Sequence, residues 1–113
     1  MSQPIPEDWL KAVCSILATR DYQKIIIRLR ARNDFQALFP GAMDFELVDA
    51  FVQALQAPGI SGSLVESMSE PGIVYEFIFV RENLPIYGKI NLSSEGTVVI
   101  IYSAHRPLKG NQL

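Results

Sequence analysis

Cysteine and histidine are almost missing from this chain. Its 113 residues include one of each, Cys14 and His105. A single cysteine excludes a disulfide framework within one chain, and one cysteine with one histidine cannot close a zinc site. Glycine-rich phosphate loops and nucleotide-binding fingerprints are also absent. We therefore expect no metal and no cofactor, and we interpret Cys14 as structural.

Long apolar runs are missing too. No apolar stretch reaches the roughly 20 residues that a membrane-spanning helix needs. The opening MSQPIPED has no basic region followed by an apolar one, so we expect a cytoplasmic protein without a membrane segment. The hydrophobic content of 49% suffices for a packed core, and the length fits a single domain over residues 1–113.

Basic residues are absent from one long central segment. Residues 40–71 carry a net charge of −5 with no basic group, although the whole chain carries only −2. Residues 20–39 carry a net charge of +3. This clustering is compatible with a local basic face on an acidic protein, and equally with an ordinary solvated surface. The basic residues of the second segment are Arg20, Lys24, Arg28, Arg30 and Arg32.

Helical spacing is clearest at two places in the N-terminal half. Residues 6–19 begin with a proline and two acids and continue with apolar residues at helical intervals, which predicts an amphipathic helix. Asp44 is expected to cap another helix, which Ala57-Pro58-Gly59 ends. The apolar face of that second helix comprises Phe45, Val48, Phe51, Val52 and Leu55.

Residues 21–39 carry two patterns at once. KIIIRLRAR alternates as a strand does, whereas the spacing of the larger apolar residues also suits a helix. The following NDFQALF predicts a helix capped by Asn33 or Asp34. Residues 60–72 are rich in serine and glycine, and we interpret them as a linker.

The C-terminal part of the chain alternates apolar and polar residues throughout. Three strands are predicted, over residues 73–80, 85–92 and 97–104, with turns at Glu82-Asn83 and Ser94-Glu95-Gly96. Helices followed by such a meander predict an α+β fold, in which N-terminal helices pack on a C-terminal three- or four-stranded antiparallel sheet.

The length of the second turn decides which side chains share a face of the sheet. With glycine in third place, a three-residue loop pairs Lys89 with Ile101 and Pro85 with His105. A four-residue loop would place Lys89 and His105 on opposite faces. In the three-residue case, one face carries Tyr87, Lys89, Ser103 and His105. The opposite face, which suits the core, carries Ile86, Ile90, Val98 and Ile100.

Lys89 has two interpretations. If Glu82-Asn83 is a two-residue turn, Glu76 lies directly opposite Lys89, and the two form a cross-strand ion pair worth about 0.2–1 kcal/mol. Beside His105, Lys89 would instead be a cation next to a group that moves protons near neutral pH. For His105 and Tyr87, the alternatives are a surface histidine at a strand end and a packing aromatic.

The closing hairpin resembles that of small bacterial ribonuclease toxins. IYGKI and VIIYSAH are similar to the (V/I)Y-x-K-(I/L) and V-x-I-x-S-x-(H/K) strands of the RelE and MqsR type. The order of DFELVDAFVQAL, an SM-containing turn and IVYEFIFV also resembles MqsR-type toxins. The resemblance covers residues 44–105 loosely and the last twenty of them more specifically.

This resemblance implies a metal-independent endoribonuclease that a cognate antitoxin holds inactive. In that chemistry the ribose 2′-hydroxyl attacks the adjacent phosphate, while a base, an acid and cations assist. On this chain, Lys89 would contact the phosphate, His105 would act as general base or acid, and Tyr87 would orient or stack on a base. The residues expected to bind RNA are Arg28, Arg30, Arg32, Arg81, Ser103 and Arg106.

A second hypothesis is a non-catalytic binding protein, such as an immunity protein or an antitoxin-like partner. It would cover a basic enzyme surface with the acidic residues 40–71. Basic residues of the hairpin and of residues 20–32 that converge on one face would favour the ribonuclease, whereas a single acidic face would favour the binding protein.

Overall fold

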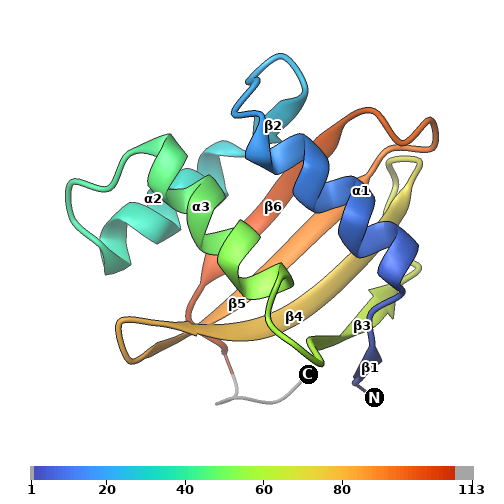
Figure 1. Cartoon of the computed structure of the whole chain (residues 1–113). Helices are drawn as coiled ribbons and strands as arrows, with labels where there is room; N and C mark the ends of the chain where they lie inside the picture. Colours follow the sequence, from blue (N-terminus) through green and yellow to red (C-terminus); the bar gives the residue numbers. More distant parts are fainter. Residues whose placement is uncertain (1, 109–113) are drawn as a thin grey trace.

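The computed structural model describes residues 2–108, which form three helices and six strands (Figure 1). The α+β class is therefore as predicted. Within residues 2–108 no helix is both long enough and apolar enough to cross a membrane. In chain order the elements are β1 (Gln3–Pro4), α1 (Glu7–Ala18), β2 (Ile25–Ile27), α2 (Leu29–Leu38), α3 (Asp44–Leu55), β3 (Ser61–Val65), β4 (Ile73–Arg81), β5 (Leu84–Leu92) and β6 (Val99–His105).

The sheet is larger and more mixed than the predicted three or four antiparallel strands. Its order is β1-β3-β4-β5-β6-β2, and β2 runs parallel to β6. The meander of β4, β5 and β6 follows the prediction. The additional strands come from short segments that carry weak signals. β3 lies inside the segment interpreted as a linker, and Gly62 fits there because a Cβ would lie 2.4 Å from the Glu76 carbonyl oxygen.

Residues 21–39 combine both of the structures that their pattern allowed. Ile25–Ile27 pair with residues 99–101 of β6, and the chain is still extended at Arg28, with ψ of 143°. The helix begins at Leu29, so the cap predicted at Asn33 or Asp34 is wrong. The helix starts earlier because Ala31 and Phe35 both reach the core from its first turns. α2 thereby packs against β6 beyond the end of β2.

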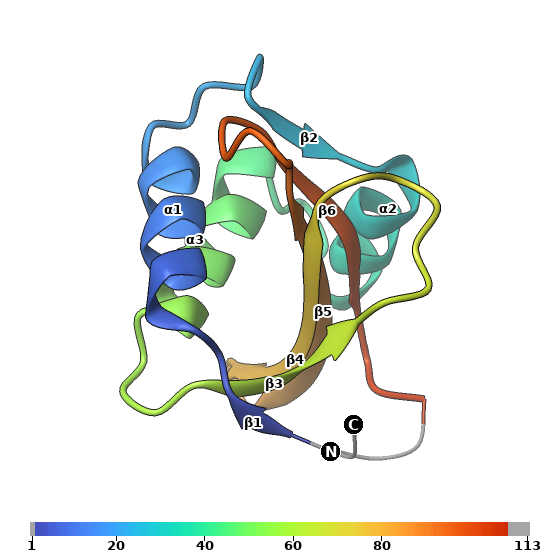
Figure 2. The ribbon, with the colours of Figure 1, turned by 90° about the vertical axis from the view of Figure 1, so that its right-hand side faces the viewer.

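The core lies between the sheet and the pair α1 and α3, which cover one face of the sheet (Figure 2). Trp9, Val13 and Leu17 are the buried residues of α1, as its helical spacing predicted. The indole of Trp9 donates a hydrogen bond of 3.0 Å to the carbonyl of Ile73, which fixes α1 to the start of β4. We call the opposite face of the sheet the open face.

Helix α3 differs in detail from its predicted apolar face. Asp44 is its first residue and not its cap; the N–H of Met43 instead donates to the Glu46 carboxylate. Phe51 is buried against Phe77 and Phe79, whereas Phe45 remains 41% exposed under the guanidinium of Arg20. The residues of α3 that are buried are Leu47, Val48, Ala50, Phe51, Ala54 and Leu55.

Candidate functional site

In the hairpin of β5 and β6, Lys89 and His105 share one face of the sheet as predicted, but the loop length and the strand register differ from the prediction. Its loop has four residues, because the Ser93 N–H donates to the Val98 carbonyl at 2.9 Å and Leu92 pairs with Val99. Alone, this loop would place Lys89 and His105 on opposite faces. A bulge follows, in which Ile90 pairs with Ile101 but Lys89 pairs with Ser103, and it adds one residue to β6 and reverses the facing again.

The four-residue loop and the bulge also change which residues of β6 reach the core. Val99, Ile101 and Ala104 are buried there, whereas the predicted Val98 and Ile100 are only partly buried. That part of the prediction is wrong because it assumed the three-residue loop. On β5, Ile86 and Ile90 are fully buried as predicted.

Tyr87 and His105 lie opposite each other on the open face and stack. Their ring centroids are 5.0 Å apart and the rings are inclined by 30°. The Nδ1 of His105 lies 2.7 Å from the carbonyl oxygen of Arg106. Because a carbonyl only accepts, Nδ1 carries a proton and Nε2 is the ring nitrogen left to exchange protons with a ligand.

Glu76 holds the other side of Tyr87. The Tyr87 hydroxyl donates a hydrogen bond of 2.5 Å to Oε1 of Glu76. Burial, and then this bond and the charge of Glu76, raise the pKa of Tyr87 above its ordinary value. Tyr87 therefore remains a protonated donor at neutral pH, and it joins the carboxylate on β4 to the imidazole on β6.

Lys89 faces Glu76 across the sheet, as the two-residue turn predicted. Glu82 and Asn83 form that turn, both with positive φ (50° and 67°). Among residues 2–108, however, Lys89 has no carboxylate within ion-pair distance. Glu76 is bound by Tyr87 instead, so the Lys89 ammonium is left available beside it. Cross-strand pairing thus sets the position of Lys89 without neutralising it.

A row of polar residues crosses the open face over four strands. The register places Ser63 of β3 beside Glu76, Glu76 beside Lys89, and Lys89 beside Ser103. All four are partly exposed. We call this row, together with Tyr87 and His105, the polar strip. Sequence reasoning missed Glu76 as a member of the site, although the hairpin register that it used already placed Glu76 there.

A second cluster borders the polar strip and fixes the segment between β3 and β4. Arg28 donates two hydrogen bonds of 2.7 Å to the carboxylate of Glu70, and the Tyr102 hydroxyl donates a third of 2.7 Å. Buried Asn91 donates to the Tyr102 hydroxyl and to the Pro71 carbonyl, both at 3.1 Å. We call this cluster the Glu70 clasp. Tyr102 takes part because the bulge turns it toward the open face beside Ser103.

The Glu70 clasp is complete at neutral pH. Hydrogen bonds from Arg28, and then from Tyr102, hold the pKa of Glu70 below its usual range. A carboxyl with a lowered folded-state pKa stabilises the fold above its unfolded-state pKa, and this contribution is lost as pH falls through the folded value. In Figure 2 the segment held by the clasp lies on the opposite side of the sheet from α1 and α3.

The arginines expected to bind RNA are mostly engaged within the chain. Arg28, Arg30 and Arg32 each have a carboxylate partner, so they do not present a row of unpaired cations. Arg81 lies on the helix-covered face, over the rings of Phe35 and Phe39. Arg106 is exposed directly after His105 and is the arginine nearest the strip in sequence. The three ion pairs are Arg28–Glu70, Arg30–Asp34 and Arg32–Asp44, with N···O distances of 2.7, 3.9 and 2.8 Å.

The polar strip is the candidate site, and it combines an acid–base pair of side chains with a cation. Within the described part of the chain, no group of three or more histidine, cysteine, aspartate or glutamate side chains could hold a metal ion. Cys14 is half-buried in α1, and burial raises the pKa of its thiol. Comparisons with protein-family models, curated proteins and solved structures find no match for this chain.

Proposed function

We propose that this protein is a metal-independent endoribonuclease that cleaves RNA by attack of a ribose 2′-hydroxyl on the adjacent phosphate. The main support is the polar strip, in which Glu76, Lys89 and His105 share the open face and Tyr87 connects the carboxylate to the imidazole. The resemblance of the closing hairpin to RelE- and MqsR-type toxins points to the same chemistry. As in that family, a cognate antitoxin is the expected partner.

Three of the four strands that carry the strip suit the three tasks of this reaction. Lys89 lies on the central strand β5, and Glu76 and His105 lie on the strands to either side. Neighbouring strands are about 4.8 Å apart, and His105 pairs with Tyr87, two residues along β5 from Lys89, so the backbones of Glu76 and His105 start about 12 Å from each other. A phosphate held by Lys89 on the side toward Tyr87 would therefore lie between the two proton-transfer groups, as in-line displacement requires.

We assign the proton transfers by the chemistry of each group. The Glu76 carboxylate takes the proton from the 2′-hydroxyl, and the oxygen so released attacks phosphorus. Protonated His105 then gives the proton on Nε2 to the departing 5′-oxygen, as the P–O5′ bond breaks. Lys89 stabilises the charge of the phosphorane. The products are a 2′,3′-cyclic phosphate and a free 5′-hydroxyl.

The binding-protein hypothesis draws less support from the arrangement of charges. Of the five acids in residues 40–71, Asp44, Asp49 and Glu70 are paired with arginines of residues 20–32. Glu46 accepts the N–H of Met43. The acidic and basic segments therefore neutralise each other within the fold, and they leave no single acidic face for a basic partner.

Cleavage of a labelled RNA in the presence of EDTA tests the proposed reaction. We expect the purified chain to cut the RNA and leave a 2′,3′-cyclic phosphate. The matched control is the same RNA with a 2′-deoxyribose at the main cleavage position, which should resist cutting there because the nucleophile is gone. No cleavage of any RNA tested, or equal cleavage of the deoxy-substituted RNA, would contradict the proposal.

The dependence of RNA affinity on salt tests which cations bind the backbone. If Lys89 and Arg106 alone, among the cations expected to contact RNA, bind the backbone, the log–log slope should be about −1.4, since each neutralised phosphate of a single strand contributes roughly −0.7. If the paired arginines open to contact RNA, five contacts would give about −3.5. Fluorescence anisotropy with a fully 2′-deoxy analogue measures binding without cleavage.

A further inference from the structure

The strand β4 has a free edge over its second half. β3 pairs with β4 only through Ser63–Glu76, Leu64–Tyr75 and Val65–Val74. β5 pairs with β4 along its whole length, from Ile73 to Arg81. Figure 1 shows β4 continuing past the end of β3 toward its turn with β5. Gly62 of β3 still lies against Phe77, and residues 78–81 therefore have a paired strand on one side only.

The backbone groups of Val80 point out from this edge. Arg81 and Leu84 flank a two-residue turn, and residues in that position form backbone hydrogen bonds with each other. The backbone N–H and C=O groups of every second residue of β4, counted back from Val80, therefore point away from β5. Val80 is one of these and is 67% exposed. Free edges are usually blunted by lysine, proline or bulges. Residues 77–80 contain neither lysine nor proline, and they pair regularly with β5.

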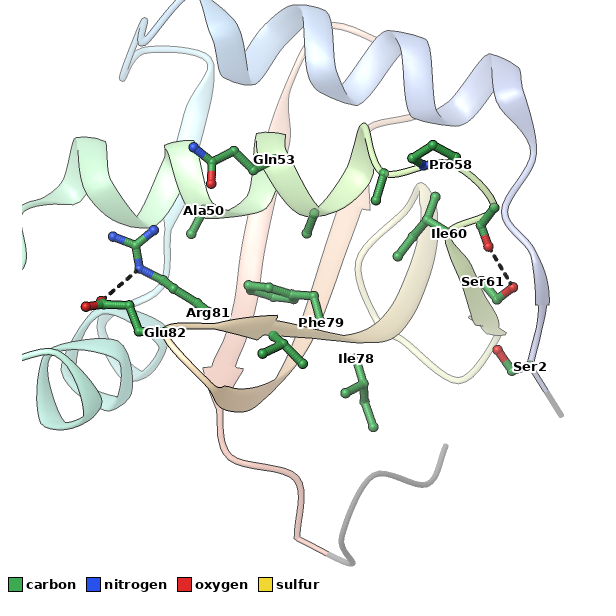
Figure 3. A pocket seen from close by; sticks show the side chains of 14 residues that line it. Ser2, Ala50, Gln53, Pro58, Ile60, Ser61, Ile78, Phe79, Arg81 and Glu82 are labelled. Carbon is green, nitrogen blue, oxygen red and sulfur yellow. Dashed lines mark hydrogen bonds and ion pairs between the residues drawn. The ribbon is translucent and has the colours of Figure 1, made fainter.

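A groove of about 800 Å³ runs beside the edge, between it and α3 (Figure 3). On the helix side the groove is lined by Ala50, Gln53 and Ala54 of α3, and by Ala57 just beyond the end of the helix. Phe79 and Ile60 supply larger apolar surface from the other side. The groove is thus wide enough for side chains that alternate from an added strand, and it lies away from the polar strip.

Arg81 gives one end of the groove a positive charge that is poorly satisfied. Its guanidinium lies 5.8 Å from the Phe35 ring centroid and 5.3 Å from that of Phe39. Its Nε is buried and has no hydrogen-bond acceptor among the described residues. The carboxylate of Glu82 is 3.8 Å away, beyond hydrogen-bonding distance, and belongs to an exposed turn residue. The Arg81 side chain as a whole is 24% exposed, so a carboxylate from outside would pair with the guanidinium.

We propose that this edge binds an extended peptide segment of a partner protein, which adds to the sheet as a strand beside β4. The segment would bond the backbone of Val80, place an apolar side chain in the groove and direct an aspartate or glutamate to Arg81. Strand addition of this kind obtains affinity from the backbone and specificity from the side-chain pockets. The inference does not depend on the ribonuclease reaction, because none of its residues belongs to the polar strip.

The test uses a displayed library of random ten-residue peptides, selected on the full-length protein. We expect the enriched peptides to alternate apolar residues and to share one acidic residue. In solution, their synthetic forms should bind at least about tenfold more weakly to R81Q, because a charge-assisted bond is lost. Peptides with glutamine in place of the acid should bind the wild type and R81Q equally.

The edge itself is tested with two variants at one position. V80P removes the outward N–H, a change that edge strands tolerate, whereas V80T keeps both the N–H and the branched side chain. Peptide binding should be lost in V80P and retained in V80T. If V80P does not fold, A57W, which adds bulk at an exposed residue of the groove, replaces it. Enrichment of no peptide, or equal binding by V80P or A57W, would overturn the proposal, as would a self-association of the wild type that V80P abolishes.

Discussion

Replacement of His105 with phenylalanine is expected to lower RNA cleavage by about 10²–10⁴-fold, the usual contribution of a general acid or base. Phenylalanine keeps a ring over Tyr87, so the stacking that holds this end of β6 is preserved, while the exchangeable proton is lost. The unfolding free energy should therefore stay within about 0.5 kcal/mol of the wild type. Cleavage rates and thermal unfolding are measured on the same preparation.

Glu76→Gln is also expected to lower RNA cleavage by about 10²–10⁴-fold. The glutamine side chain has nearly the same shape and can still accept the hydrogen bond from Tyr87, so the geometry of the strip is retained. It cannot take a proton from the 2′-hydroxyl. Tyr87→Phe is the matched positioning variant: it removes only the hydroxyl that holds Glu76 and should cost much less than the loss of either proton-transfer group.

Two results would contradict these assignments. If H105F cleaves RNA as the wild type does, His105 takes no part in proton transfer. If E76Q is fully active while H105F is not, the carboxylate serves only to hold Tyr87, and His105 alone moves the protons. A preparation of either variant that has lost its cooperative unfolding transition is excluded from the comparison by the thermal measurement.

For the closing hairpin, the side chains that share the open face could be predicted from the sequence, but the loop length and the bulge that place them there could not. Sequence alternation correctly assigned the strands and the turn at Glu82-Asn83, since two residues with positive φ fit that connection. The four-residue loop and the bulge at Tyr102 each reverse the facing of β6, and together they restore the predicted one. Alternation within one strand carries no signal for a bulge, because the extra residue is fixed by contacts with Glu70 and Asn91, which lie elsewhere in the chain.

The arginine cluster shows a more general reason why the site was predicted only in part. Arg28 pairs with a carboxylate 42 positions away, and Arg20 with one 29 positions away. A count of charges along the chain separates the basic segment from the acidic one, although folding brings them together. The pairing of Glu76 with Lys89, by contrast, depends on the two-residue turn at Glu82-Asn83, which is local, and so it could be predicted from the sequence.

The second large expected effect is a loss of stability when a buried residue of helix α3 is changed. Phe51→Ala is expected to destabilise the protein by about 3–5 kcal/mol, as for other buried phenylalanines. The Phe51 ring packs edge-on to Phe77 at 5.8 Å between centroids and also contacts Phe79 at 5.2 Å. It fills space that Gly88 leaves open, since a Cβ on Gly88 would lie 2.5 Å from its Cε1. Urea denaturation with an unchanged m-value measures the loss.

Phe45→Ala on the same helix is the control, and it should cost no more than about 1 kcal/mol, the value of an exposed cation–π contact with Arg20.

The contact of Phe51 with Gly88 gives a second check of this packing. Gly88→Ala should destabilise the wild type by about 1–3 kcal/mol through overpacking, and much less in the Phe51→Ala background, where the ring is gone. Equal losses for Phe45→Ala and Phe51→Ala, or additive effects of the Phe51 and Gly88 changes, would show that the core is not packed around this ring.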